Sequence, residues 1–527
     1  MRFAARSFFG LWAIMVVGWL QGCAPLPPLN SRVPSVSIRD TADTRLGRAI
    51  LPLVQAHPER SGVVPLLSGR DAFAARMRLA DAAERSLDVR YYIWHKDLTG
   101  TLLLDALRRA ADRGVRVRLL LDDNGTSDLD DSLAALDAHP KIEVRLFNPF
   151  RNRNWRPLGY LFDFARLNRR MHNKSFTADN QATVIGGRNV GDEYFGAGND
   201  FLFVDLDVLA IGPVVDDVSS DFDRYWASAS SFPVRDVLPP IGQQAVSALA
   251  AAAAAVAQEP AALSYMQALA ESPFVQSLLA HTLDFDWAQV SMVSDDPAKG
   301  LGVAPDDELL WARLKRVMKR PEHDMKLVSA YFVPGAEGVA FFSAMAASGV
   351  KVAVLTNSLE ATDVAAVHAG YAKRRKALLE AGVRLFELKR IWDATMPMPV
   401  PVQKPVERRA PPSTVGSSGS SLHAKTFSLD GSRIFIGSFN FDPRSARLNT
   451  EMGFVIESPA LAQSVVQSFA RNMPQRAYEV LLTRDGSLNW IEHDGDKEIV
   501  HVEEPGTGFW KRLGVSLLSK LPIEWLL

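Results

Sequence analysis

The chain of 527 residues has one cysteine, no excess of either charge, and no apolar run long enough to cross a bilayer. A single thiol leaves no partner for a disulfide. The balance of 59 Lys+Arg against 60 Asp+Glu gives no whole-chain signal for nucleic-acid binding, so any anion site must be local. The apolar run from Phe8 to Leu20 has about thirteen residues, whereas a membrane-spanning helix needs about 20.

The N-terminus has the pattern of a cleaved signal peptide. Arg2 and Arg6 precede the apolar run, and Leu-Gln-Gly-Cys ends it at Cys23. This ending resembles the lipobox of bacterial lipoproteins and predicts a signal peptide over 1–22, a lipid on Cys23 and a tether over 23–65. The alternative is an incidental cysteine in an uncleaved anchor. Ala24, where inner-membrane lipoproteins have aspartate, favours a periplasm-facing protein on the outer membrane of a bacterial cell envelope.

One short pattern occurs twice. MHNKSFTAD at 171–179 and LHAKTFSLD at 422–430 share His-x-Lys-x4-Asp, which gives His172, Lys174, Asp179, His423, Lys425 and Asp430. A glycine-led turn with an asparagine follows each copy at the same distance, GGRN ending at Asn189 and GSFN ending at Asn440. Paired imidazoles, ammonium groups and amides suit the opening of a phosphodiester through a phospho-enzyme, and this chemistry requires no metal and no other cofactor.

Strands and helices repeat around the two motifs. A strand at 88–94, a helix at 101–114 and a strand at 115–123 have counterparts at 326–334, 338–349 and 350–357, and a further helix and strand follow in each half. Strands that alternate with helices predict parallel pairing and a layered α/β domain. The chain therefore reads as two such domains in tandem.

The motif residues have predictable directions. His and Lys stand two apart, so on a strand both point to one face. Gly187 and Ser438 are small and let a phosphate approach the backbone. Downstream, Asp205 and Glu451 occupy equivalent places and are suited to orient the histidines, while Asp179 and Asp430 fall at turns that they would brace.

Composition divides the chain further. We expect an N-terminal domain over 66–235, a helical connector over 236–285, a C-terminal domain over 286–480 and an amphipathic tail over 481–527. A Pro/Ser/Gly-rich insertion at about 391–421 precedes the second motif, as a plain loop or as a lid.

The paired motifs, each followed by Gly-Gly/Ser-x-Asn, resemble the phospholipase D superfamily from about residue 70 to 480. GSFNFDPRSARLNTEMG at 437–453, YYIWHKDLTG at 91–100 and the lipoprotein start are similar to bacterial cardiolipin synthases of the C type. The resemblance implies two tandem α/β/α domains with pseudo-twofold symmetry, each a mixed, largely parallel sheet flanked by helices, whose motifs meet at one cleft.

The resemblance also implies a reaction. His172 would attack a phospholipid phosphorus to form a phosphatidyl-histidine, and His423 would protonate the leaving alcohol and then activate the glycerol headgroup of phosphatidylglycerol. Lys174, Lys425, Asn189 and Asn440 would hold the phosphate oxygens. The symmetry leaves open which histidine attacks. The donor, phosphatidylglycerol or phosphatidylethanolamine, and the need for a helper protein stay open as well.

Three segments could bring the chain to a membrane: the lipid on Cys23, the Arg- and aromatic-rich segment 149–170, and the basic tail 508–527. The last two could equally pack on their own domain. Competing functions are a phospholipase D-type hydrolase, a nuclease, which the neutral charge disfavours, a toxin-like lipase, and a non-catalytic lipoprotein scaffold, which two complete motif sets disfavour.

Overall fold

The computed structural model describes residues 26–390 and 419–527, apart from 154, 198–200, 281, 472 and 496. The expected leader, Cys23 and residues 391–418 of the expected insertion lie outside the described residues. Within the described part, none of the helices combines the length and apolar character that a membrane crossing needs.

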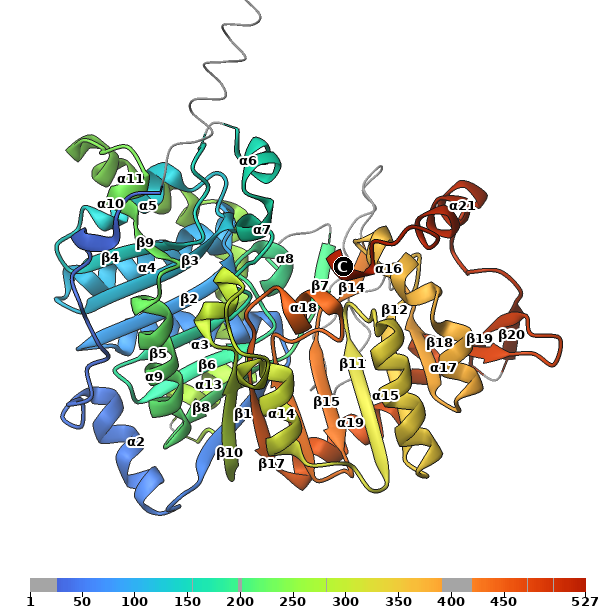
Figure 1. The fold of residues 1–527 in the computed structure, drawn as a ribbon. Coiled ribbons are helices and arrows are strands. Elements are labelled where there is room, and N and C mark those ends of the chain that lie inside the picture. Colours follow the sequence, from blue (N-terminus) through green and yellow to red (C-terminus); the bar gives the residue numbers. More distant parts are fainter. Residues whose placement is uncertain are drawn as a thin grey trace, which may run out of the picture.

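The described strands form one 18-stranded sheet whose order is the same in both directions from its centre (Figure 1). At the centre β1 pairs antiparallel with β10, with Ser61 opposite Ala288. Outward from the centre, the N-terminal half runs β1 (Ser61–Leu66), β8 (Asp207–Ile211), β6 (Ala182–Gly186), β5 (Ser175–Ala178), β2 (Ser86–Ile93), β3 (Arg116–Gly125), β4 (Ile142–Phe147) and β9 (Ser231–Pro233).

The C-terminal half repeats this order strand for strand. It runs β10 (Asp286–Ser294), β17 (Met452–Glu457), β16 (Arg433–Gly437), β15 (Lys425–Leu429), β11 (Asp324–Ser329), β12 (Lys351–Asn357), β13 (Arg384–Leu388) and β18 (Ala477–Leu482). Two more strands, β19 (Leu488–Asp494) and β20 (Lys497–His501), extend its outer edge. A separate parallel pair joins β7 (Phe201–Val204) of the first half to β14 (Gly419–Leu422) of the second.

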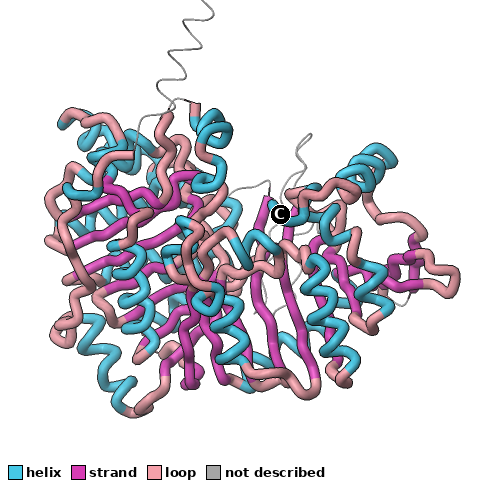
Figure 2. The backbone as a smooth tube through the Cα atoms, viewed as in Figure 1, coloured by secondary structure: helices cyan, strands magenta, loops and turns pink. Residues whose placement is uncertain are grey.

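Helices flank the sheet in both halves (Figure 2). Those of the first half and the connector are η1 (Leu29–Ser31), α2 (Arg45–Gln55), α3 (Gly69–Ala82), α4 (Leu98–Asp112), α5 (Asp130–Asp137), α6 (Arg156–Phe162), α7 (Phe164–Leu167), α8 (Asp192–Phe195), α9 (Val214–Ala227), α10 (Val234–Val237), α11 (Gln243–Ala257), α12 (Pro260–Ala270) and α13 (Pro273–Leu279). Those of the second half are η2 (Pro297–Leu301), η3 (Asp306–Glu308), α14 (Leu310–Met318), α15 (Gly335–Ala347), α16 (Ala365–Ala372), α17 (Arg375–Glu380), α18 (Pro443–Arg447), α19 (Pro459–Arg471), α20 (Met473–Arg476), α21 (Phe509–Leu518) and η4 (Glu524–Leu526).

Local chemistry sets the limits of the crossover helices. The side chain of Asp97 caps α4 by accepting a hydrogen bond from Gly100 N–H. Gly114 follows α4 with φ +98°, and Gly349 follows α15 with φ +89°, a left-handed conformation that glycine adopts without strain. These glycines turn the chain into β3 and β12.

Among the described strands of the large sheet, parallel pairing is limited to β2–β3–β4 and β11–β12–β13. The strands after each motif are joined by tight hairpins, β5–β6 and β15–β16, and a hairpin can only pair its strands antiparallel. The expected mixed sheet flanked by helices is confirmed, but the expectation that it is largely parallel is corrected.

Two segments that we placed outside the domains belong to the sheet. The expected tether 23–65 contains α2 and most of β1, which lies at the sheet centre; Pro65 hid this strand, because proline is unusual in a central strand. The expected tail 481–527 contributes β19 and β20 before its helix α21. The connector 236–285 carries α11, α12 and α13.

The two halves share a hydrophobic core. One buried cluster combines Val63, Ile185 and Val208 of the first half with Ile436 and Phe454 of the second. Burial of apolar surface between the halves holds them together. Residues of one half therefore keep a fixed position relative to residues of the other.

Candidate active site

The His-x-Lys residues lie next to the first strand of each hairpin. Lys425 is the first residue of β15, while His172, Lys174 and His423 occupy segments that precede β5 and β15. The expectation that His and Lys both lie on a strand is therefore corrected, while each lysine amine still lies beside the histidine of its own motif. The histidines come before the sheet pairing begins.

Backbone contacts between the halves take the place of that pairing. Met171 forms a parallel bridge with Thr450, and β14 pairs with β7. His172 N–H donates to Thr450 O at 2.9 Å, and His423 N–H donates to Val204 O at 2.7 Å. Thr450 precedes Glu451, and Val204 precedes Asp205. These backbone bonds therefore place each histidine next to a carboxylate of the other half.

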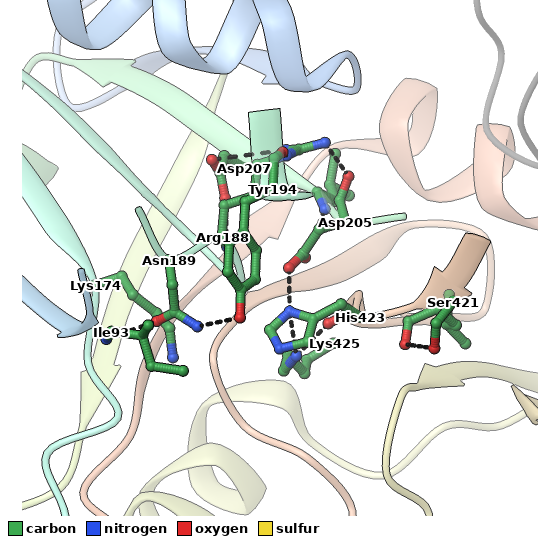
Figure 3. Close-up of polar contacts among 12 residues, drawn as sticks. Ile93, Lys174, Arg188, Asn189, Tyr194, Asp205, Asp207, Ser421, His423 and Lys425 are labelled. Carbon is green, nitrogen blue, oxygen red and sulfur yellow. Dashed lines mark hydrogen bonds and ion pairs between the residues drawn. The ribbon is translucent and has the colours of Figure 1, made fainter. Parts of the chain in front are cut away.

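Each imidazole consequently bonds to a carboxylate of the opposite half. His172 Nδ1 lies 2.8 Å from Glu451 Oε2. His423 Nδ1 lies 2.5 Å from Asp205 Oδ2, as Figure 3 shows. An ionised carboxylate only accepts, so Asp205 and the ionised form of Glu451 place the imidazole proton on Nδ1 and leave the lone pair of the neutral ring on Nε2. Both rings therefore have Nε2 available for reaction.

The site combines neutral rings with buried amines. Lys174 Nζ donates to His172 O at 2.6 Å, and Lys425 Nζ lies 2.9 Å from His423 Nδ1. Burial lowers the pKa of Lys425 to about 8 and lowers the pKa of Lys174 well below its usual value. Burial and the neighbouring lysines lower the pKa of His423 to about 4 and that of His172 well below its usual 6.5. An anion bound here would relieve the repulsion among these groups.

The two carboxylates differ in charge. Burial opposes the ionisation of Asp205, but His423 and Lys425 outweigh it and keep the pKa of Asp205 below its usual value. Burial raises the pKa of Glu451 to about 7, against the opposing charge of Lys174. The two histidines therefore have unequal partners.

Gly187 and Ser438, expected near the phosphate, contact these carboxylates instead. Ser438 Oγ donates to Glu451 Oε2 at 2.5 Å. A Cβ at Gly187 would lie 2.2 Å from Asp205 Oδ1, which leaves no room for a side chain. The serine holds one orienting carboxylate, and the glycine makes space for the other.

The asparagines also lie in this region. Asn189 accepts from Ile93 N–H at 3.3 Å and donates to the Tyr194 hydroxyl at 3.0 Å (Figure 3). Asn440 is buried, and its Oδ1 has no hydrogen-bond partner among the described residues. Buried polar atoms are normally paired, so the amide of Asn440 is suited to meet a polar group of a ligand.

Asp179 and Asp430 lie at the far ends of β5 and β15, away from the histidines. Asp179 accepts from the N–H groups of 84–86, and Asp430 accepts from those of 322–324. Both adopt left-handed backbone, with φ +48° and +52°, at the hairpin turns. This is the placement of a brace that fixes each motif hairpin to the strand beside it.

Aromatic rings complete the surroundings of the histidines, and the motif analysis missed them. The ring of Tyr92 meets His172 edge-on at 5.0 Å, and that of Tyr194 meets His423 at 5.3 Å. Alternation along 88–94 carried a usable signal, because Tyr91 is fully buried in the core and Tyr92 must face the other side. Asp295, noted only as part of a polar loop, accepts from Glu451 N–H at 2.8 Å.

In the described part of the chain, one group of side chains is arranged so that it could bind a metal ion: His95, Asp97 and Glu193. Asp97 already accepts from Gly100 N–H and Asp192 N–H, at 2.9 and 2.7 Å, and His95 pairs with Glu193 at 3.0 Å. These hydrogen bonds and this ion pair explain why the three side chains lie close together, and no metal ion is needed to explain it.

Two pseudo-symmetric α/β halves that bring paired His-x-Lys motifs into one buried site define an enzyme of the phospholipase D superfamily. The chain belongs to the family described as cardiolipin synthase, PLD-like domain, whose model matches residues 77–226 and 314–473. The resemblance drawn from the motifs is thereby confirmed.

Relatives match over nearly the whole chain. Cardiolipin synthase C of Escherichia coli (strain K12) is 52% identical over 484 residues, which cover 92% of this chain and 100% of the relative. An uncharacterized protein of Helicobacter pylori (strain J99 / ATCC 700824) is 29% identical over 511 residues, covering 95% and 96%. The crystal structure of phosphatidylserine synthase from Haemophilus influenzae Rd KW20 superposes with a TM-score of 0.54 at 14% identity, over 82% of this chain and 92% of that one, and shows the shared fold.

Proposed function

We propose that this chain is a membrane-associated phosphatidyltransferase that makes cardiolipin, with phosphatidylglycerol as the acceptor. The observation that supports it most directly is the pair of crossed contacts, His172 with Glu451 and His423 with Asp205, beside two buried lysines. The similarity to cardiolipin synthase C supports the choice of product. The two catalytic domains comprise 66–235, with β1 added at the sheet centre, and 286–480, with β19 and β20 added at its outer edge.

The reaction has two displacements at phosphorus. Nε2 of His172 attacks the phosphodiester of the donor lipid, an N–P bond forms, and the P–O bond to the headgroup alcohol breaks as His423 gives that oxygen a proton. Neutral His423 then takes the proton of the glycerol hydroxyl of phosphatidylglycerol, whose oxygen displaces His172. Lys174, Lys425, Asn189 and Asn440 hold the non-bridging oxygens, and their charges and dipoles stabilise the transition state.

Unequal carboxylates favour His172 as the nucleophile. The ionised Asp205 stabilises a cationic His423, as an acid–base group requires. Burial and the two lysines lower the pKa of His172 and leave its ring neutral with a free lone pair, and Glu451, whose pKa is raised to about 7, supplies less opposing charge than Asp205. A bound diester anion raises the pKa of His423, which allows it to carry the proton for the leaving alcohol.

The setting of the reaction is part of the proposal. A lipid on Cys23 would hold the chain at a bacterial envelope, facing the periplasm and preferentially at the outer membrane. Phosphatidylglycerol and phosphatidylethanolamine both fit as donors, and a helper protein is compatible with the reaction. A mature protein that carries no lipid on Cys23 by mass spectrometry would contradict the lipid anchor.

Lipid analysis tests the function. The chain is expressed in a bacterium that lacks its own cardiolipin synthases, and we expect cardiolipin to appear. His172→Ala and His423→Ala should abolish it, while His323→Ala, at an exposed histidine far from the site, should not. Release of phosphatidic acid without cardiolipin would contradict the synthase and favour the hydrolase.

A further inference from the structure

Two helical segments present large apolar side chains at one rim of the molecule. On α6 and the residue before it, Trp155 is 66% exposed and Leu161 is 75% exposed; on α21, Trp510 is 80% and Leu517 is 57% exposed. In Figures 1 and 2 both helices project from the same end, on either side of the β7–β14 pair. Single apolar residues on a surface are ordinary, but large ones gathered at one end mark an interaction surface.

The sequence of α21 is apolar on two faces. Val515 is buried on α16 beside Leu359, which fixes the inner face. Phe509, Leu513 and Leu517 repeat every four residues and remain exposed. A helix that only covered a core would show polar side chains outward, so this face has a partner.

The charges of α21 indicate the nature of that partner. From Phe509 to Leu521 the charged residues are Lys511, Arg512 and Lys520, all basic. Lys511 Nζ donates to Leu359 O and Arg512 pairs with Glu503, both at 2.6 Å, while Lys520 is exposed. A helix with outward Trp, Phe and Leu and no acidic residue suits the headgroup level of a phospholipid bilayer, where rings and aliphatic chains enter the interface and a cation meets phosphates.

Helix α6 is connected to the site by short contacts. Tyr160 on α6 donates to Asn124 Oδ1 at 2.9 Å, and Asn124 Nδ2 donates to the Tyr92 hydroxyl at 3.4 Å. The Tyr92 ring meets His172 edge-on. The position of α6 is therefore fixed relative to His172.

The C-terminal end is tied to the same region by Arg444 of α18. Its guanidinium donates to Asn168 O at 3.0 Å and to Leu526 O at 3.1 Å, and its backbone N–H donates to Leu527 O at 2.9 Å. Asn168 directly follows α7, and Asn440 lies four residues before Arg444. Both apolar segments are thus anchored to residues that border the site.

We propose that Trp155, Leu158 and Leu161 of the α6 segment, with Phe509, Trp510, Leu513 and Leu517 of α21, form a bilayer-docking rim that holds the active site at the headgroup level of a phospholipid membrane. The inference rests on the proposed function, because a lipid donor and a lipid acceptor both remain in the bilayer. Two insertion points on opposite sides of the site would fix its orientation as well as its distance from the membrane.

A position-specific probe tests the rim. Cys23→Ser removes the only cysteine, so a cysteine introduced at Leu161 or Leu517 can be labelled alone with a polarity-sensitive fluorophore. Leu53→Cys on α2, 43% exposed at the opposite end, is the matched control. On vesicles of phosphatidylethanolamine and phosphatidylglycerol, we expect a blue shift and quenching by headgroup-level lipid quenchers at 161 and 517, and neither at 53. Labels at 161 and 517 that stay in water on vesicle-bound protein would overturn the rim and leave a protein partner.

Activity separates docking from chemistry. Leu161→Glu and Leu517→Glu should lower turnover on vesicles by about tenfold or more and leave turnover of a detergent-dispersed short-chain substrate unchanged. Leu53→Glu should change neither. Equal losses in both assays would overturn the proposal, because the helices would then act on the fold of the site. If the wild-type protein transfers nothing while the labels still enter vesicles, the docking rim is supported and the proposed function fails.

Discussion

His172 of the first half bonds to Glu451 of the second, Nδ1 to Oε2 at 2.8 Å, although 279 residues separate them. His423 bonds in the same way to Asp205, 218 residues earlier. Each half therefore supplies the histidine of one pair and the carboxylate of the other. Neither half by itself pairs its motif histidine with a carboxylate, so the candidate active site is complete only when both halves are packed together.

The crossed contacts predict how Glu451→Gln will behave. The amide carries no negative charge and can turn its NH2 group toward His172, which favours the other tautomer, so we expect turnover to fall by roughly 100- to 10,000-fold in a folded protein. Steady-state kinetics with circular dichroism as the folding check measures this effect.

Non-additivity provides the control for that prediction. If Glu451 acts through His172, the double variant His172→Ala with Glu451→Gln should be no slower than His172→Ala alone. A further loss in the double variant would mean that Glu451 has a separate role.

Substitutions at Gly187 and at Ser438, which lie next to the two carboxylates, should lower turnover by different amounts. Gly187→Ser introduces a Cβ that collides with the Asp205 carboxylate, and we expect a large loss of turnover. Ser438→Gly removes one hydrogen bond to Glu451 and should cost less, roughly 10- to 100-fold, since a bond to a charged group contributes about 1.5–3 kcal/mol. Equal effects of the two changes would contradict the packing of Asp205 against Gly187.

Rate should depend on pH through Lys425. Burial lowers the pKa of Lys425 to about 8, and the amine is cationic only below that value. We therefore expect kcat/KM to fall as pH rises through about 8, and to fall on the acid side only where the nucleophile His172, whose pKa is lowered well below 6.5, becomes protonated in the free enzyme. Lys425→Arg keeps its charge at all these pH values, so its kcat/KM, though lower, should not decline near pH 8. A decline that stays at the same pH in Lys425→Arg would assign it to another group.

The motif aspartates should affect stability more than chemistry. Asp179→Ala leaves the N–H groups of 84–86 without their acceptor, and we expect the free energy of unfolding to fall by about 1–3 kcal/mol. Turnover per folded molecule should change little, and Asp40→Ala, at an exposed aspartate, should change neither quantity. Denaturant unfolding and active-site titration measure the two effects, and loss of turnover at full stability would give Asp179 a chemical role.

Much of the fold followed from local patterns. The strand expected at 115–123 corresponds to β3 and that at 350–357 to β12, because apolar runs bounded by glycine turns are local signals. β1 was missed because Pro65 interrupts its pattern. The antiparallel hairpins were underestimated because the repeated helix–strand units drew attention to parallel pairing.

The site residues were also named from the sequence, but their connections were not. Asp205 and Glu451 were identified as orienting groups by their spacing alone. Which histidine each one contacts depends on the Met171–Thr450 bridge and on the pairing of β7 with β14, and both join the two halves. Contacts of such long sequence separation leave no periodicity in a single sequence, so no local pattern could have shown the crossing.

The most direct measurement of the central claim is the identity of the residue that carries the phosphatidyl group. With a phosphatidyl-p-nitrophenol donor the leaving group needs no proton, so His423→Ala should release about one equivalent of nitrophenolate per site and stop as phosphatidyl-His172. Rapid quench and peptide mass spectrometry then locate the adduct, with His172→Ala as the control. We predict an adduct on His172 in His423→Ala and none in His172→Ala. The assignment would be contradicted if His172→Ala carries an adduct on His423 while His423→Ala carries none on His172.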